Sequence, residues 1–334
     1  MNIKFNNIDS VLRISKTGPY GVSIAAMKGD EIVTYCSGSG RRDGALPVNS
    51  DMLFQAGSVS KPAFAATLLR FVDKGKIDLD ADISGVIPEF AKAPMSFPAL
   101  LSHTAGFNVH GFEGYHAKHK LLSLEDVLMG RGNSPAVRQT MPYGEQSVYS
   151  GGGITLAELA FTRILGMTLR EAFEKEVAQP LGLTRSGYFQ PLDEDLTKNA
   201  AFGGNLKKND NYHYYPEHAA AGLWTTPTDL VKLGVALSRS IREGGFLSKE
   251  SAQRMAAPVM NGYGLCLNRW VSPVRGDEVA GHDGWNEGFL TSWTFSVNED
   301  ICTAAMINRS TVWIDNKLTL IEAKVYKQAK REAK

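Results

Sequence analysis

The sequence predicts a mixed α/β (α+β) fold, in which helices flank one antiparallel sheet built from strands at both ends of the chain. Residues 21–27 and 31–37 are apolar, β-rich runs joined at Lys28-Gly29-Asp30, which indicates a hairpin. Residues 289–297 and 301–307 have the same character near the other end. Helical patterning dominates between them, so the sequence predicts a large, mostly helical insertion that interrupts one sheet.

The remaining elements follow from their periodicity. A short helix is expected over residues 8–15, and a second helix from Ser58 to about Val72. Helical segments continue to roughly Leu181. Residues 263–268 are expected to form a further strand, and residues 313–330 a closing amphipathic helix.

This pattern predicts two subdomains. Residues 1–57 and 216–334 would form the sheet subdomain, and residues 58–215 the mostly helical one. The chain has 334 residues, of which 43% are hydrophobic, and that is enough for a substantial core. The groove between the subdomains is the expected place for an active site.

Charge excludes several classes of partner. The chain has 36 basic and 35 acidic residues, so no strong field attracts phosphate backbones, and we expect no nucleic-acid partner.

Residues 1–7 lack the apolar stretch of a signal peptide, and no later run reaches membrane-spanning length. We therefore expect no membrane insertion and a cytoplasmic location, although a secreted form trimmed of its signal would look the same.

Residues that can bind metals are assigned other roles. The cysteines are odd in number, lie far apart and sit in apolar, strand-like surroundings, which predicts buried thiols: Cys36, Cys266 and Cys302. Three histidines in a Gly-rich, aromatic segment lack an acidic or cysteine partner at convincing spacing: His110, His116 and His119. We expect neither a metal nor a cofactor.

The chemistry begins with a serine and a lysine three positions apart. Ser58 and Lys61 would lie on one face of a helix, within reach of each other. Ser58 stands where that helix begins, so free backbone N–H groups favour a developing oxyanion there. Ser58 is the only serine in the chain with lysine at the third following position. A helix-capping serine beside an exposed lysine is the simpler alternative, and further motifs must decide.

Those motifs occur further along the chain. In order they are Leu100-Leu101-Ser102-His103-Thr104-Ala105-Gly106-Phe107, Tyr149-Ser150-Gly151, Ala220-Ala221-Gly222-Leu223-Trp224-Thr225-Thr226-Pro227, and Gly281-His282-Asp283-Gly284-Trp285. From about residue 8 to 308 the chain thus resembles the class C β-lactamase and penicillin-binding-protein-like serine hydrolases. That family includes esterases, D-amino-acid peptidases and acyltransferases. The resemblance implies a β-lactamase/DD-peptidase-like fold.

The resemblance also implies roles for individual residues. Ser58 matches the acylated nucleophile and Lys61 its basic partner. Tyr149 matches the tyrosine of the Tyr-x-Asn motif, which moves a proton between nucleophile, leaving group and water. The segment 282–284 matches the Lys-Thr-Gly strand, with His282 as a catalytic residue, and the backbone N–H groups of Ser58 and Trp285 would form the oxyanion hole. Free lysine and tyrosine titrate near pH 10, so each needs a neighbour or burial to act as a base, and their order stays open.

The substrate class is inferred from positions at which this chain differs from the family's motifs. Gly151 replaces the family's asparagine, so no side chain there binds a scissile amide. Asp283 replaces a threonine and is expected to repel a substrate carboxylate, while His282 is a weaker, mostly neutral substitute for lysine. The sequence therefore favours an esterase acting on a small-molecule acyl substrate. A β-lactamase or D-amino-acid peptidase or amidase is the main alternative, and a penicillin-recognising receptor or an acyltransferase stays open, as does the oligomeric state.

The segment from Phe107 to Leu121 is expected to form the rim of the groove. Its aromatic residues Phe112 and Tyr115 would contact the acyl group, with ordinary loop packing as the alternative. Phe107, Gly284 and Trp285 are also expected to bind substrate. The three glycines at 151–153 lack the lysine and spacing of a phosphate loop and indicate a close backbone turn. His103 is expected to be structural and hydrogen-bonded to backbone.

Overall fold

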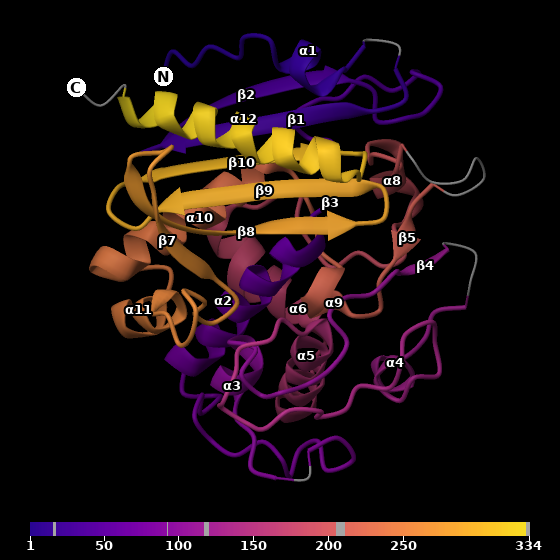
Figure 1. Ribbon diagram of the computed structural model, residues 1–334, viewed down its shortest axis with the longest axis vertical. Helices are drawn as coiled ribbons and strands as arrows, with labels where there is room; N and C mark the ends of the chain where they lie inside the picture. Colours follow the sequence, from indigo (N-terminus) through magenta and orange to yellow (C-terminus); the bar gives the residue numbers. More distant parts are fainter. Residues whose placement is uncertain (16–17, 92, 117–119, 205–210, 332–334) are drawn as a thin grey trace.

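A six-stranded antiparallel sheet lies at the centre of the computed structural model, which describes residues 1–15, 18–91, 93–116, 120–204 and 211–331 (Figure 1). The strand order is β2-β1-β10-β9-β8-β7. The strands are β1 (Gly21–Lys28), β2 (Glu31–Gly38), β7 (Asn268–Ser272), β8 (Asp277–Asn286), β9 (Phe289–Ser296) and β10 (Ile301–Ile307). Because β1 pairs with β10, the two ends of the chain share one sheet, as predicted.

Helices cover both faces of this sheet. On the outer face, α12 (Val312–Arg331) lies over β1, β10 and β9, and α1 (Ile8–Leu12) packs beside it (Figure 1). Apolar side chains of α12 such as Leu318 pack there against Ile24 and Leu290. On the inner face, α10 (Pro227–Glu243) packs against β1, β9 and β10. Because both faces are covered, β9 and β10 are buried along their whole length.

The helical region lies beyond the inner face and shares its core with the sheet (Figure 1). Its helices are α2 (Ser60–Asp73), α3 (Phe97–Leu101), α4 (Leu124–Leu128), α5 (Gly151–Leu165), α6 (Leu169–Phe173), α7 (Gln179–Leu181), α8 (Glu194–Lys198), α9 (His218–Ala221) and α11 (Lys249–Ala256). A 3₁₀ turn, η1 (Gly57–Val59), precedes α2, and a π-helical turn, η2 (Glu174–Ala178), follows α6. Two short ladders, β3 (Phe54–Gln55) with β6 (Trp224–Thr225) and β4 (Tyr115–His116) with β5 (His213–Tyr214), complete the fold.

Several predicted elements are confirmed. The hairpin, the strands at 289–297 and 301–307, and the closing helix are present, whereas the first helix is shorter than expected. The predicted strand at 263–268 is wrong, because the chain there turns instead of extending. Asn261, Gly262 and Cys266 all have positive φ, and Tyr263 makes only isolated bridges.

The insertion is less helical than predicted. Between α3 and α5 the described residues contain one helix, α4, and the short strand β4, and the rest is turns and irregular chain held by side-chain and backbone hydrogen bonds. Cys266 and Cys302 are buried free thiols, and Cys36 is half-buried. None of the helices in the described residues is both long and apolar enough to cross a membrane.

Candidate active site

Ser58 lies in the tight turn η1, two residues before α2 begins. Gly57 has φ +54°, a left-handed conformation that glycine adopts without strain. The Ser60 hydroxyl donates to the Gly57 carbonyl at 2.6 Å and accepts from the Leu223 N–H at 2.9 Å. These two bonds fix the turn, so the half-buried Ser58 side chain is held at the start of α2.

Lys61 extends from the first turn of α2 toward Ser58. Its Nζ lies 3.0 Å from Ser58 Oγ and donates to the Ala220 carbonyl of α9 at 2.8 Å. Only 2% of the lysine is exposed, and in the described part of the chain no carboxylate pairs with its amine. Burial lowers the pKa of Lys61 to about 7. A substantial share of the amine is therefore uncharged at neutral pH.

Two glycines let strand β8 approach this turn. A Cβ atom on Gly284 would lie 1.9 Å from the Ala56 carbonyl oxygen, and one on Gly57 would lie 2.6 Å from the Trp285 nitrogen. Trp285 pairs with Leu290 beside a two-residue hairpin turn, and the alternation of antiparallel bonds directs its N–H away from β9. The Trp285 amide is thus brought next to η1, whereas its side chain is 44% exposed.

Tyr149 also lies close to Ser58, and it stands two residues before α5 begins. Its hydroxyl is buried and makes no hydrogen bond of standard geometry. Burial raises the pKa of Tyr149 above its usual value of 10, and nearby Ser58 only partly offsets this. Lys61 Nζ lies 4.9 Å from the centre of the tyrosine ring. The hydroxyl is therefore protonated at neutral pH and free to donate.

The start of α5 is covered by the preceding loop. The N–H groups of Gly151 and Gly152 donate to the carbonyls of His110 and Val109, each at 3.0 Å. A Cβ on Gly151 would lie 3.1 Å from the ring of Phe112. The glycines thus permit a close backbone approach, and Phe112 occupies the space beside position 151.

His282 and His103 are joined through Tyr263. The Tyr263 hydroxyl lies 3.1 Å from Nε2 of each histidine. His282 Nδ1 lies 2.6 Å from the Asp283 carbonyl oxygen, and the Ser150 N–H donates to His103 Nδ1 at 3.2 Å. Burial, together with the charge of Lys61, lowers the pKa of His282 to about 3 and holds the pKa of His103 well below its usual range. Both imidazoles are therefore neutral.

The sequence did not indicate this link. The expected backbone bond of His103 is present, but the role of Tyr263 was missed, because its segment was taken for a strand. The Ala220 carbonyl that holds Lys61 was missed as well, because a backbone group leaves no signal in residue type. Ser58, Lys61, Tyr149 and His282 nevertheless lie in one cluster, with rings of Tyr149 and His282 centred 6.0 Å apart.

Comparison with known proteins identifies the family of this chain. The family model described as Beta-lactamase matches residues 14–324. The chain belongs to the Beta-lactamase family. It is similar to the acyltransferase calJ of Penicillium decumbens, at 31% identity over 42% of this chain and 39% of calJ. It is also similar to the esterase EstB of Burkholderia gladioli, at 27% identity over 50% of this chain and 46% of EstB, so the matches span less than half of these two curated relatives.

Solved structures confirm the predicted fold. The D-amino acid amidase of Ochrobactrum anthropi SV3, complexed with D-phenylalanine, superposes with a TM-score of 0.79. The identity is 20%, and the match covers 98% of this chain and 97% of the amidase. At this identity the match shows the β-lactamase/DD-peptidase-like fold alone.

In this member of the Beta-lactamase family, Asp283 does not face Ser58. Side chains alternate along a strand, and Gly284 faces η1, so Asp283 points to the opposite face of the sheet. It pairs there with Ser292 of β9, and the charges of Asp315 and Arg275 act on its carboxyl. Burial raises the pKa of Asp283, although part of the side chain keeps contact with solvent. The expected repulsion of a substrate carboxylate by Asp283 is therefore wrong.

Two of the expected rim residues are also placed elsewhere. Phe107 is 2% exposed and belongs to the main core. Tyr115 is buried, stacks on Tyr214 with ring centres 5.5 Å apart, and accepts a hydrogen bond from the Asn133 N–H. Both residues therefore serve in packing and do not line the site. Phe112 is the aromatic residue of this segment that lies beside Gly151.

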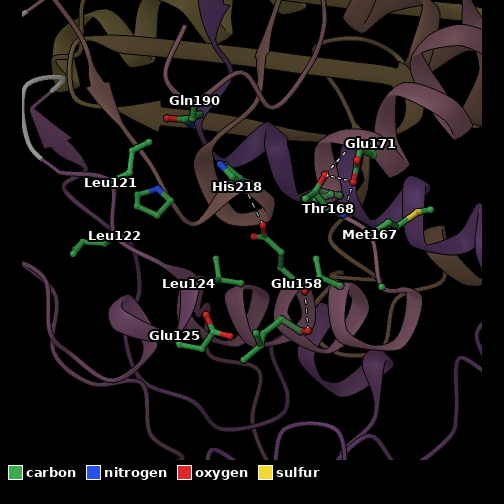
Figure 2. Close-up of a pocket in the computed structure, with 15 residues that line it drawn as sticks. Leu121, Leu122, Leu124, Glu125, Glu158, Met167, Thr168, Glu171, Gln190 and His218 are labelled. Atoms are coloured by element: carbon green, nitrogen blue, oxygen red, sulfur yellow. Dashed lines mark hydrogen bonds and ion pairs between the residues drawn. The ribbon is translucent and has the colours of Figure 1, made fainter.

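A cavity of about 500 Å³ lies behind the site, between α5, α6 and α9 (Figure 2). Its lining does not include Ser58. Glu158 and His218 point toward each other in it, and Glu158 accepts a hydrogen bond from the Ala219 N–H at 2.7 Å. Because the next residue, Ala220, binds Lys61, α9 separates this cavity from the catalytic amine.

Metal ligands do not gather in the part of the chain that the structure describes, where no group of three suitable side chains is found. His110 packs against the ring of Tyr149, with ring centres 4.9 Å apart, and His116 lies against His213. His119 lies outside the described residues.

Proposed function

We propose that this chain hydrolyses esters of small or medium acyl groups through an acyl-enzyme formed on Ser58. The observation that carries the proposal is the buried Lys61 amine, 3.0 Å from Ser58 Oγ and with a pKa of about 7. An uncharged amine beside a hydroxyl is a general base in position to activate a nucleophile.

In the first step, neutral Lys61 takes the proton of Ser58 as Oγ bonds to the acyl carbon. One Lys61 N–H stays on the Ala220 carbonyl, which leaves the lone pair free to turn toward Ser58. The carbonyl oxygen becomes an oxyanion, and the N–H groups of Ser58 and Trp285 would bind it. The glycines at 57 and 284 support this assignment, because they bring the two backbone segments together.

Tyr149 would complete the proton path. Since its hydroxyl keeps its proton and lacks a partner of its own, it can donate to the leaving alkoxide as the bond to the acyl carbon breaks. Protonated Lys61 then restores the proton of Tyr149. Water repeats the sequence in the second half-reaction and releases the acid. Lys61 is thus proposed as the first base and Tyr149 as the acid.

The groups around the nucleophile support esters over anionic β-lactams. His282 is neutral, so its position offers no cation for a substrate carboxylate. Position 151 offers no amide-binding side chain, and Phe112 makes that wall apolar. An ester needs neither anchor and has a better leaving group than an amide. Similarity to the esterase EstB and to the acyltransferase calJ supports acyl-group chemistry on an ester.

Steady-state kinetics would test the proposal. Purified protein is assayed with p-nitrophenyl butyrate, nitrocefin and a D-alanyl peptide, with Ser58→Ala as the control. We expect kcat/KM for the ester to exceed that for nitrocefin by at least about 10-fold, because two polar anchors are missing. Preference for nitrocefin or the peptide would contradict the ester assignment. Stable acylation of Ser58 without turnover, seen by intact mass, would identify a receptor.

A further inference from the structure

A chain of four hydrogen bonds connects the start of α5 with strand β8. It runs from the Ser150 N–H to His103 at 3.2 Å, then to Tyr263 at 3.1 Å. From Tyr263 it continues to His282 at 3.1 Å and ends on the Asp283 carbonyl at 2.6 Å. The three side chains are nearly inaccessible, with exposed fractions of 3% for His103 and 7% for both Tyr263 and His282.

The two ends of this chain fix its direction. A backbone N–H can only donate, so His103 Nδ1 carries a lone pair and the ring proton lies on Nε2. His103 Nε2–H therefore donates to the Tyr263 oxygen, and the single hydroxyl proton of Tyr263 must donate to His282 Nε2. His282 then carries its proton on Nδ1 and donates to the Asp283 carbonyl, which can only accept.

The two histidines are therefore locked in opposite tautomers. His103 is the Nε2–H form and His282 is the Nδ1–H form. Both nitrogens of His282 are occupied, one by an incoming hydroxyl and one by a backbone carbonyl. His282 has no free lone pair for a substrate or for Ser58, which argues against the catalytic role that the sequence suggested for it.

We propose that Tyr263 is a positioning residue of the active site. It holds the rings of His103 and His282, and both rings lie against Tyr149, with centres 4.4 Å and 6.0 Å from the tyrosine ring. Through Ser150 the chain also ties the residue next to Tyr149 to β8, which carries the Trp285 amide. Tyr263 thus sets the distance between the acid and the oxyanion site, while proton transfer stays with Lys61 and Tyr149.

The tautomers can be measured without any substrate. The protein is labelled with ¹⁵N-histidine, and long-range ¹H–¹⁵N correlation spectra at pH 7 report which ring nitrogen carries the proton. The chain has seven histidines, and single His→Gln variants assign them. We expect His103 as the Nε2–H tautomer and His282 as the Nδ1–H tautomer, both neutral. An Nε2–H or doubly protonated His282 would overturn the proposal.

The kinetic consequence rests on the proposed ester hydrolysis. Tyr263→Phe keeps the ring but removes the hydroxyl, so His282 loses its donor and His103 its acceptor. We expect kcat for the ester to fall by about 5- to 20-fold, as for a lost hydrogen bond that orients a catalytic group, with KM within about 2-fold. The His282 signals should move toward a tautomeric mixture.

Tyr326→Phe is the matched control. Tyr326 is also buried, and its hydroxyl donates to Asp277 at 2.8 Å on the outer side of the sheet. This variant should lower the Tm without changing kcat or the His282 signals. Unchanged kcat and tautomer in Tyr263→Phe would overturn the positioning role. Absence of ester turnover in the parent would count against the proposed function alone, since the spectra would still test the hydrogen-bond chain.

Discussion

The two flanks of the candidate active site are built in different ways. On one flank, Ser58 and Lys61 are three residues apart, and one turn of chain brings their side chains within 3.0 Å. On the other flank, His103, Tyr263 and His282 come from distant segments, and their contact depends on the packing of a loop, a turn and a strand. Local spacing therefore indicates the nucleophile directly, whereas the roles of its neighbours become visible only when the chain is folded.

The largest effect should come from the locally built flank. Ser58→Ala removes the proposed nucleophile, so ester turnover should fall by on the order of 10⁴-fold or more. A fluorophosphonate probe should label Ser58 in the parent and nothing in the variant. Intact mass and peptide mapping would measure this. A label on Ser102, with Ser58 unmodified, would show that the spacing argument selected the wrong serine.

The next effect concerns the base and the acid. Lys61→Ala and Tyr149→Phe should each lower kcat by about 10²–10⁴-fold, and the double variant should lose little more, because both residues serve one proton path.

The pH profile separates the two roles. The pKa of Lys61 is lowered to about 7, so the amine is protonated and inactive as a base below that pH and neutral above it. In the parent, kcat/KM should therefore rise with pH through about 7. A flat profile between pH 6 and 8, or a Tyr149→Phe enzyme with a near-normal rate, would contradict the proposed order of proton transfer.

A smaller effect on kcat is expected where strand β8 contacts η1, the turn that holds Ser58. In Gly284→Ala, the new Cβ would lie 1.9 Å from the Ala56 carbonyl oxygen, so β8 must move away from η1. Displacing one oxyanion donor should lower kcat by about 10- to 100-fold. Gly85→Ala is the control, because its Cβ would meet no atom within 4 Å. Equal rates for the two variants would remove the Trp285 amide from the mechanism.

The sequence predicted much of the fold for a physical reason. Strands buried on both faces and amphipathic helices leave strong patterns, and these gave the hairpin, β9, β10 and α12. Turns leave weaker patterns. The segment around Tyr263 is apolar enough to look like a strand, but positive φ at Asn261 and Cys266 depends on contacts that the pattern does not contain.

Prediction of the site residues was limited in the same way, because sequence patterns do not contain tertiary contacts. Asp283 could have been excluded from the substrate side at the sequence level, because neighbouring residues of a strand face opposite sides, and His282 was already assigned to the groove. The burial of Tyr115 and Phe107 could not be foreseen in the same way. Both lie in an irregular segment without periodicity, where only tertiary packing determines which side chain turns inward.

The smallest expected effect is on stability and concerns Glu217, which precedes α9, the helix that binds Lys61. Its carboxyl is fully buried without a side-chain hydrogen bond, and burial raises its pKa from 4.5 to about 8. Between these values the unfolded chain loses the proton first, so this group destabilises the fold progressively as pH rises from 4.5 to 8. Glu217→Gln cannot ionise, so its Tm relative to the parent should be higher by a few degrees at pH 8, with a smaller gain at pH 5. Thermal unfolding at both pH values measures this difference, and a variant that is less stable than the parent at pH 8 would show that the carboxyl has a partner when ionised.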